Sequence, residues 1–143
     1  MVADGTPPDV ITFAGNGEPT MHPDFEAVIG DTIALRDALC PAAKVSVLSN
    51  ATQIHRDSVR RALLRVDNNI LKLDSAFDAT VRRMNNPQSA SYTVLVAEIR
   101  PRQVMVYSLD RDTPCPTLEK VTKEELQAIA ARVEALGIPC SVA

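Results

Sequence analysis

Short apolar segments alternate with segments of helical periodicity along almost the whole chain, at intervals of roughly 25–35 residues, the length of one βα unit. The apolar segments that indicate strands are residues 11–13, 45–48, 69–74, 103–109 and 138–142. This alternation constrains the fold more than any other feature, because strands joined through helices form a parallel sheet with right-handed crossovers. The sequence therefore predicts an α/β protein with about five parallel strands. The pattern alone leaves an open doubly wound sheet and a partial barrel as alternatives.

Helical signals separate these strands. The segments that we expect to be helical are residues 24–39, 56–66, 77–84 and 122–136. The last is the best marked, because Thr122 and Glu125 form a capping box and Gly137 follows as a C-cap. Residues 92–99 are ambiguous, since Val-Leu-Val favours a strand and Ala-Glu-Ile favours a helix. The arginines of the second helix indicate an ion-paired surface.

Composition excludes several classes of function. The chain has 143 residues, enough for one domain, and a formal net charge of −3. This acidic balance argues against a surface for nucleic-acid phosphates, and the sequence has no long apolar run or signal-peptide pattern. We therefore expect no nucleic-acid partner and no membrane partner. Cys40, Cys115 and Cys140 form no CxxC pair, which indicates free thiols in a reducing, cytoplasmic compartment and no metal site.

A glycine-bracketed turn follows the first strand. Gly15 and Gly17 let the backbone take positive φ and approach a ligand closely. Glu18 beside them, at the carboxyl end of a strand, suits an ammonium group or hydroxyls of a ligand. The turn is not a dinucleotide fingerprint, because Thr20 stands near where a third glycine belongs, and no P-loop Gly-Lys-Ser/Thr follows. An ordinary βα turn with a solvated glutamate is the alternative.

The strand at residues 69–74 carries polar side chains on one face. Alternation places Ile70, Lys72 and Asp74 together, whereas a parallel strand covered on both sides should be apolar throughout. This pattern favours a partly polar barrel interior or cleft, and a Lys72–Asp74 pair solvated at a sheet edge is the alternative. The polar residues at the predicted strand ends are Glu18, Ser49, Asn50, Lys72, Asp74, Tyr107 and Asp110. In a parallel barrel they would face one rim, although no arrangement identifies a catalytic residue.

Four blocks resemble, in the same order, the core of radical S-adenosylmethionine (SAM) proteins. They are ITFAGNGEPTMHPDF, VSVLSNAT, ILKLDSAFDATVRRMNNP and RPRQVMVYSLDRDTPCPTLEKV. The resemblance covers most of the chain and implies a partial (βα) barrel of the radical SAM type, with ligand-binding loops at the carboxyl ends of the strands. It implies that residues 1–143 form a single (βα)-type domain, a fragment of a larger radical SAM core.

The resemblance also implies a cofactor site. The residues that it assigns to SAM binding are Gly15, Asn16, Gly17, Glu18, Pro19, Ser49, Asn50, Lys72 and Asp74. The glycine loop would contact the amino group of SAM, and the later residues would lie near its methionine carboxylate or ribose. A rim with donors, acceptors and both signs of charge suits such a zwitterionic, hydroxyl-rich ligand.

Two departures from the family pattern limit what is expected of this chain. Family members cleave SAM reductively with a 4Fe-4S cluster held by a CxxxCxxC loop, and no cysteine precedes the glycine turn here. We therefore do not expect the cluster, or radical chemistry, in this chain alone. Between Pro87 and Arg100 there is room for one element at most, so we expect the barrel to be open or incomplete there.

Three functions are compatible with these observations. The first is a radical SAM iron–sulfur oxidoreductase or activase core, with a protein or peptide as a candidate substrate. The second is a non-catalytic (βα) scaffold remnant that binds a small metabolite or a protein partner. The third is an unrelated (βα) enzyme that uses Glu18, Lys72 and Asp74 for acid–base chemistry. The first explains four sequence blocks in order and is therefore preferred.

Overall fold

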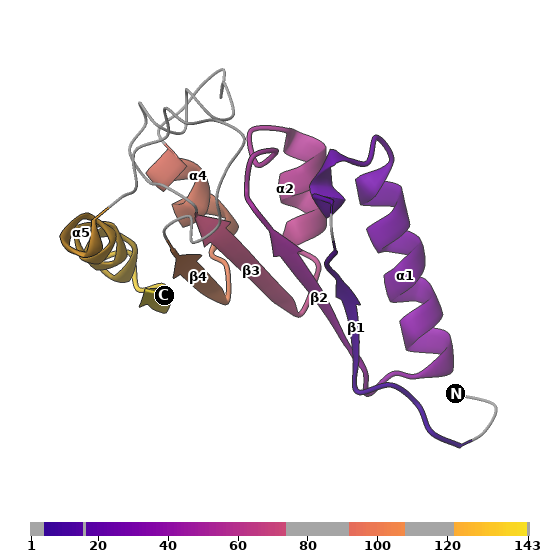
Figure 1. The fold of residues 1–143 in the computed structure, drawn as a ribbon. Coiled ribbons are helices and arrows are strands. Elements are labelled where there is room, and N and C mark those ends of the chain that lie inside the picture. The colour runs from indigo at the N-terminus through magenta and orange to yellow at the C-terminus, as the bar shows by residue number, and fades with distance from the viewer. Residues whose placement is uncertain (1–4, 16, 74–91, 108–121, 143) are drawn as a thin grey trace.

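One parallel sheet organises the protein. A computed structural model describes residues 5–15, 17–73, 92–107 and 122–142. The strands are β1 (Val10–Phe13), β2 (Lys44–Ser49), β3 (Asn68–Leu73), β4 (Gln103–Val106) and β5 (Cys140–Val142). All four strand pairings are parallel, in the order β1-β2-β3-β4-β5 (Figure 1). The predicted α/β class with five parallel strands is confirmed.

Helices fill the connections between these strands. They are the short 3₁₀ helix η2 (Pro19–Met21), α1 (Phe25–Leu39), α2 (Asp57–Leu63), α4 (Tyr92–Ile99) and α5 (Lys123–Glu134). The ambiguous residues 92–99 are helical, and α5 has the predicted capping box. Our predicted helix at 77–84 lies outside the described residues. No described helix is long and apolar enough to cross a membrane.

The strand order decides between the two architectures that the sequence left open. Strands that are neighbours in the chain are also neighbours in the sheet, so the right-handed crossovers place their helices on one face. Accordingly, α1, α2 and α4 lie on the same side of the sheet (Figure 1). This is the arrangement of a segment of a (βα) barrel and not of a doubly wound sheet. Within the described residues the sheet ends at β1 and β5 and does not close. We expected an opening between Pro87 and Arg100, but β3 and β4 pair directly across that connection.

The core lies between the sheet and its helices. Val47, Leu71 and Val104 are fully buried on three successive strands. Ile29 of α1 and Leu63 of α2 pack in the same cluster. The hydrophobic effect of burying such side chains, about 1.5–3 kcal/mol each, holds the helices on this face.

The opposite face of the sheet is more polar. Along β3, Leu71 and Leu73 are buried, whereas Ile70 and Lys72 are partly exposed on the other side. Lys72 is the register partner of Met105 on β4. The predicted alternation in this strand is therefore confirmed up to Leu73. Asp74 lies outside the described residues.

A carboxylate at the amino ends of the strands fixes the spacing of β2 and β3. One oxygen of Asp67 accepts hydrogen bonds from the Val45 backbone N–H and from Arg36 Nη1, both at 2.8 Å. Arg36 also donates to the carbonyl of Ala43, which ties the end of α1 to the same corner. The Val45 hydrogen bond, followed by those of the guanidinium, lowers the pKa of Asp67. The charged form of Asp67 therefore stabilises the fold.

Candidate ligand-binding site

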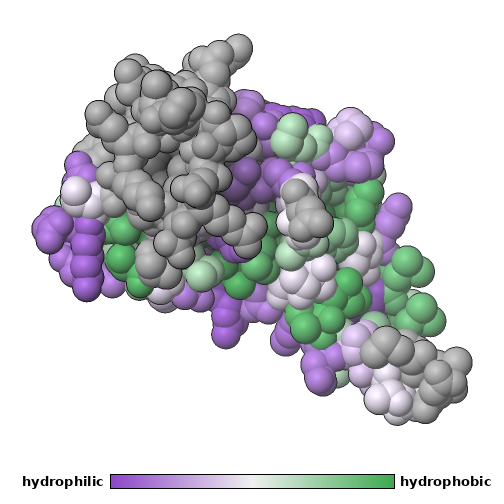
Figure 2. Space-filling view, viewed as in Figure 1, coloured by the Kyte–Doolittle hydropathy of each residue, from purple (hydrophilic) through white to green (hydrophobic). Residues whose placement is uncertain are grey.

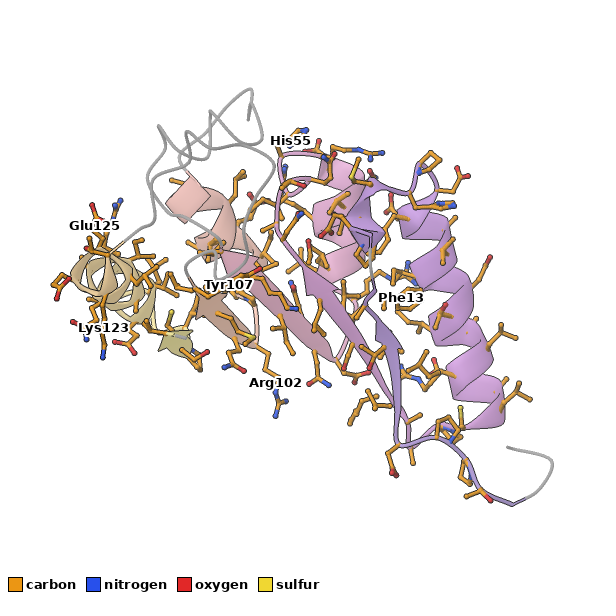
Figure 3. The ribbon with its side chains drawn as sticks, in the orientation of Figure 1. Phe13, His55, Arg102, Tyr107, Lys123 and Glu125 are labelled. Atoms are coloured by element: carbon orange, nitrogen blue, oxygen red, sulfur yellow. The ribbon has the colours of Figure 1, made fainter. Side chains whose placement is uncertain are left out.

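A cavity of about 280 Å³ opens at the carboxyl ends of four strands. Its lining residues are Ala14, Gly15, Gly17, Glu18, Leu48, Asn50, Lys72 and Tyr107. Figure 3 shows Tyr107 and Arg102 at the two ends of β4, so the cavity lies on the Tyr107 side. The volume is near the lower end of small-molecule sites, roughly 300–1,000 Å³. Five residues of the predicted site therefore meet in one cavity.

Glu18 connects the glycine turn to the end of β2. Its Oε1 accepts hydrogen bonds from the Thr20 backbone N–H at 3.1 Å, from Thr20 Oγ1 at 2.5 Å and from Ser49 Oγ at 2.7 Å. Its Oε2 accepts one from the Asn50 backbone N–H at 2.7 Å. A carboxylate oxygen offers about two lone-pair positions, so Oε2 retains acceptor capacity for a ligand. Four hydrogen bonds therefore hold the Glu18 carboxylate in place, and its Oε2 can accept one more from a ligand.

The buried Ser49 hydroxyl holds the Glu18 carboxylate in position. Only 1% of Ser49 is exposed, and its hydroxyl donates to Glu18 while it accepts from the Ala51 N–H at 2.9 Å. It does not line the cavity, and neither does Pro19, which begins η2. The structure thus assigns both residues to holding the loop, and their direct contact with a ligand stays a prediction. Asn16, Asp74 and Asp110 lie outside the described residues.

Asn50 reaches the cavity from a constrained loop. Its side-chain Oδ1 accepts from the Thr52 N–H at 3.0 Å, which fixes the direction of the amide. The next residue, Ala51, is buried and has φ of 63°. This left-handed conformation costs a non-glycine residue about 1–2 kcal/mol. Such strain persists only where surrounding contacts impose it, and it is common at functional sites.

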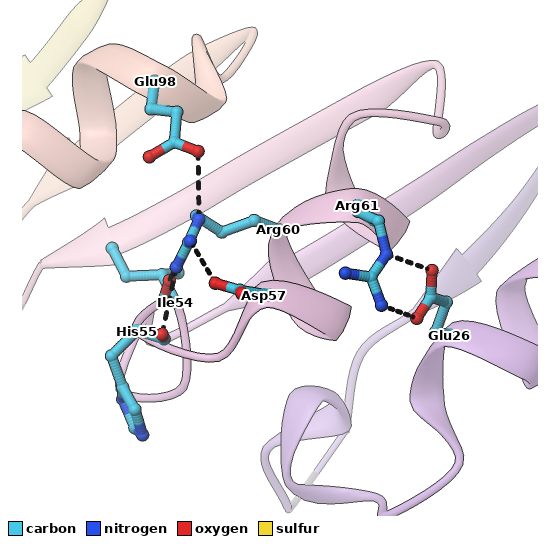
Figure 4. A network of polar contacts seen from close by, with 7 residues as sticks. All are labelled: Glu26, Ile54, His55, Asp57, Arg60, Arg61 and Glu98. Atoms are coloured by element: carbon cyan, nitrogen blue, oxygen red, sulfur yellow. Dashed lines mark hydrogen bonds and ion pairs between the residues drawn. The ribbon is translucent and has the colours of Figure 1, made fainter.

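Arg60 of α2 holds the far end of the same loop (Figure 4). Its Nη1 donates to the carbonyls of Ile54 and His55, both at 3.0 Å, which holds the end of the loop that begins at Asn50. Its Nε bonds Glu98 of α4 at 3.1 Å. The neighbouring Arg61 forms the expected surface ion pair with Glu26. Sequence reasoning treated all these arginines alike and missed Arg60, because its partners are recognisable only in the folded chain.

Lys72 brings a positive charge to the cavity. It lies on the open face of β3, and the ion pairs among the described residues do not include it. Glu18 and Lys72 therefore place opposite charges on the walls of one cavity. Opposite charges in fixed positions can bind the two ends of a zwitterion, and Asn50 and Tyr107 add polar groups to the same cavity.

The described thiols do not meet at the cavity. Cys40 follows α1 and precedes the amino end of β2, the end of the sheet opposite the cavity. Cys140 begins β5, and burial raises the pKa of its thiol. Within the described ranges no group of three or more His, Cys, Asp or Glu residues is placed to hold a metal ion. Since a cluster needs convergent thiolates, these residues do not fit a 4Fe-4S site. Cys115 lies outside the described residues.

Comparisons with known proteins find the fold only among solved structures. No protein-family model matches the chain, and no curated protein matches it. SuiB of Streptococcus suis bound to precursor peptide SuiA is similar over 93% of this chain and 28% of its own, with 14% identity and a TM-score of 0.60. SuiB bound to S-adenosylmethionine is similar over 93% and 29%, with 15% identity and a TM-score of 0.59.

A radical SAM methyltransferase from Sphaerobacter thermophilus is also similar, over 99% of this chain and 52% of its own, with 16% identity and a TM-score of 0.49. The chain spans less than a third of the length of the peptide-bound and S-adenosylmethionine-bound SuiB chains. At these identities the likeness to SuiB shows the fold alone, part of a (βα) barrel. It does not extend to the activity.

Proposed function

We propose that the cavity binds S-adenosylmethionine through its amino-acid part, as the SAM-binding portion of a radical SAM iron–sulfur oxidoreductase or activase core. The observation that carries this proposal is the meeting of the glycine turn, Glu18 and Lys72 in one cavity at the strand carboxyl ends. SuiB, which has the same fold, has been seen bound to S-adenosylmethionine. That support is an analogy between folds.

The chemistry of each wall matches one end of the ligand. The Lys72 ammonium would pair with the methionine carboxylate, a charge-assisted contact of about 1.5–3 kcal/mol. The free acceptor position on Glu18 Oε2 would take a hydrogen bond from the α-ammonium group. Asn50 and Tyr107 would serve the ribose hydroxyls. Neither Gly15 nor Gly17 has the positive φ that the sequence led us to expect. Both have open space where a Cβ would stand, which lets the turn approach the ligand closely.

The radical reaction itself requires more than these residues. A 4Fe-4S cluster supplies the electron that cleaves SAM in the family, but the described residues do not fit one. Residues 1–143 would then form one (βα) domain of a longer cytoplasmic core. A peptide is a candidate substrate, since SuiB has been seen with a precursor peptide.

A second candidate is a non-catalytic scaffold that binds a small metabolite or a protein partner. The position of Cys40 at the opposite end of the sheet from the cavity favours this role for the chain by itself. Anaerobic reconstitution with iron and sulfide, read by visible absorbance and EPR, separates the two candidates. A cluster whose signal changes on adding SAM supports the enzyme core, and a folded protein without a cluster supports the scaffold.

Calorimetric titration with SAM tests the binding proposal directly. We expect a dissociation constant on the order of 10–100 µM, about −6 kcal/mol. Lys72→Met should weaken binding about tenfold or more, because it removes the carboxylate partner. The matched control is Lys44→Met, an exposed lysine at the amino end of β2, whose loss should leave SAM affinity unchanged. No binding at about 1 mM SAM, or equal losses in both variants, would refute the proposal.

A further inference from the structure

Arg60 joins α2, α4 and the loop that precedes α2. Its Nη1 donates to the carbonyls of Ile54 and His55, both at 3.0 Å, and its Nε donates to Glu98 of α4 at 3.1 Å. Its Nη2 donates to Asp57 within α2. Figure 4 shows these contacts converging on one guanidinium, and the Arg60 side chain is only 17% exposed. A planar fork of donors in fixed directions suits this task, and a lysine does not reproduce it.

The two carbonyls belong to the loop that carries Asn50 into the cavity. This loop runs from the end of β2 at Ser49 to the start of α2 at Asp57. Its amino end is fixed by the hydrogen bond from the Asn50 N–H to Glu18 Oε2 at 2.7 Å, and its far end is fixed by Arg60. Figure 2 shows hydrophilic side chains gathered above the start of α2, where the loop meets solvent. Apolar packing therefore does not hold the outer side of the loop, and hydrogen bonds must.

Ala51 is the strained residue of this loop. Its φ of 63° is a left-handed conformation that is unfavourable for a residue with a Cβ, so contacts on both sides must impose it. On the amino side, the Ala51 N–H donates to Ser49 Oγ at 2.9 Å. On the carboxyl side, the hydrogen bond from the Ile54 N–H to the Ala51 carbonyl is long, at 3.4 Å. Burial anchors the Ile54 side chain in the core, whereas Arg60 fixes the directions of two consecutive peptide groups.

The backbone of Ala51 also decides where the Asn50 amide lies. Asn50 Oδ1 accepts a hydrogen bond from the Thr52 N–H at 3.0 Å, and Ala51 stands between these two residues in the chain. A change in φ and ψ at Ala51 would move the Thr52 N–H away and release the amide. We propose that Arg60 is a positioning residue of the cavity: by holding the two loop carbonyls, it keeps Ala51 left-handed and the Asn50 side chain in the cavity wall. Its effect on SAM affinity rests on the proposed function.

Arg61 provides a matched control on the same helix. It carries the same charge, its side chain is 60% exposed, and it pairs with Glu26 of α1 through Nε at 2.8 Å and Nη2 at 2.7 Å. Its bonds go to α1 and not to the loop, and neither residue of the pair lines the cavity. An effect of lost charge, or of a weaker α2, would appear in both Arg60→Gln and Arg61→Gln. An effect of the loop carbonyls would appear only in Arg60→Gln.

Hydrogen exchange in the ligand-free protein tests the positioning role. In Arg60→Gln the Thr52 amide, which donates to Asn50, should exchange about tenfold faster than in the wild type, because the loop opens more often. The amides of the central strand β3 should keep their exchange rates, and Arg61→Gln should leave Thr52 unchanged. A merely structural role would instead accelerate the loop and the strand by the same factor. That result, or an unchanged Thr52 amide, would overturn the proposal.

Calorimetric titration with SAM measures what the loop contributes to binding. Arg60→Gln should raise the dissociation constant about fivefold, and Arg61→Gln should not change it. Asn50→Ala should raise it as well. Adding Arg60→Gln to Asn50→Ala should then have little further effect, because Arg60 acts through Asn50. Fully additive losses would contradict that route. Arg60→Lys keeps the charge but not the fork of donors, so its dissociation constant should lie between those of the wild type and Arg60→Gln.

The two measurements separate the positioning role from the proposed function. If the wild type binds no SAM, the proposed function is refuted, and the exchange of the Thr52 amide alone decides whether Arg60 holds the loop. If the wild type binds SAM while Arg60→Gln and Arg60→Lys bind it as tightly as Arg61→Gln does, the positioning role is refuted and the proposed function stands. Arg60→Lys gives both comparisons if Arg60→Gln does not fold.

Discussion

Replacing Glu18 with glutamine should destabilise the protein, because the carboxylate serves four donors at once. In the wild type, Thr20 contributes two donors and Ser49 one to Oε1, and Asn50 contributes one to Oε2. A glutamine has one acceptor oxygen and one donating amide. If the oxygen keeps the three donors, the amide N–H₂ of Glu18→Gln faces the Asn50 N–H and repels it.

The magnitude follows from these contacts. The substitution loses one charge-assisted hydrogen bond, worth about 1.5–3 kcal/mol, and weakens the remaining three by removing the charge. We expect a loss of about 2–3 kcal/mol, which lowers the melting temperature by about 6–9 °C in a chain of this size. Ser49→Ala removes one donor of three from Oε1 and also the acceptor of the buried Ala51 N–H, so we expect a comparable loss of about 2–3 kcal/mol.

Urea denaturation followed by circular dichroism measures these free energies. Glu124→Gln is the control, since Glu124 lies exposed on α5 and its replacement should change stability by less than about 0.5 kcal/mol. The reasoning is refuted if Glu18→Gln behaves like this control, because Glu18 would then be solvated as in an ordinary βα turn. A Ser49→Ala variant that is as stable as the wild type would equally contradict the assigned network.

Three further predictions concern residues outside the site. The Val45 N–H, and after it Arg36, lowers the pKa of Asp67 in the folded protein. The ionised carboxylate therefore stabilises the fold fully above about pH 4, and this contribution is lost as the pH falls through the pKa of the folded state. The stability gap between wild type and Asp67→Asn should therefore shrink between pH 5 and pH 2 in urea titrations, and a constant gap would contradict this. Asn69 is 5% exposed, and neither the nitrogen nor the oxygen of its side-chain amide has a hydrogen-bond partner among the described residues. Asn69→Val should therefore raise the free energy of unfolding by about 1 kcal/mol or more, and a lower free energy of unfolding would show that the amide has a partner. Arg100 follows α4, is exposed and has φ of 46°, a left-handed conformation that suits glycine. Arg100→Gly should therefore stabilise the protein by about 0.5–1 kcal/mol and raise its melting temperature, and a lower melting temperature would show that the arginine side chain is needed.

Much of the fold could be predicted because its signals are local. The capping box of Thr122 and Glu125 acts within one helical turn, and the side-chain alternation that exposes Lys72 acts within one strand. Residues 92–99 are the exception. Their apolar side chains suit a strand or a helix, and packing of Leu95, Val96 and Ile99 into the core accompanies the helix. Burial against other elements decides such segments, and the sequence does not display it.

The candidate site divides in the same way. The sequence by itself identified the glycine turn, Glu18 and Lys72, because each follows or occupies an apolar strand whose carboxyl end must meet the others in a parallel sheet. Only the tertiary structure turned Ser49 toward Glu18 and gave Arg60 its partner Glu98. These contacts join residues 31 and 38 positions apart in the chain. Periodicity and capping extend over about four residues, whereas the orientation of a side chain at a site depends on donors and acceptors that the register of the sheet brings together.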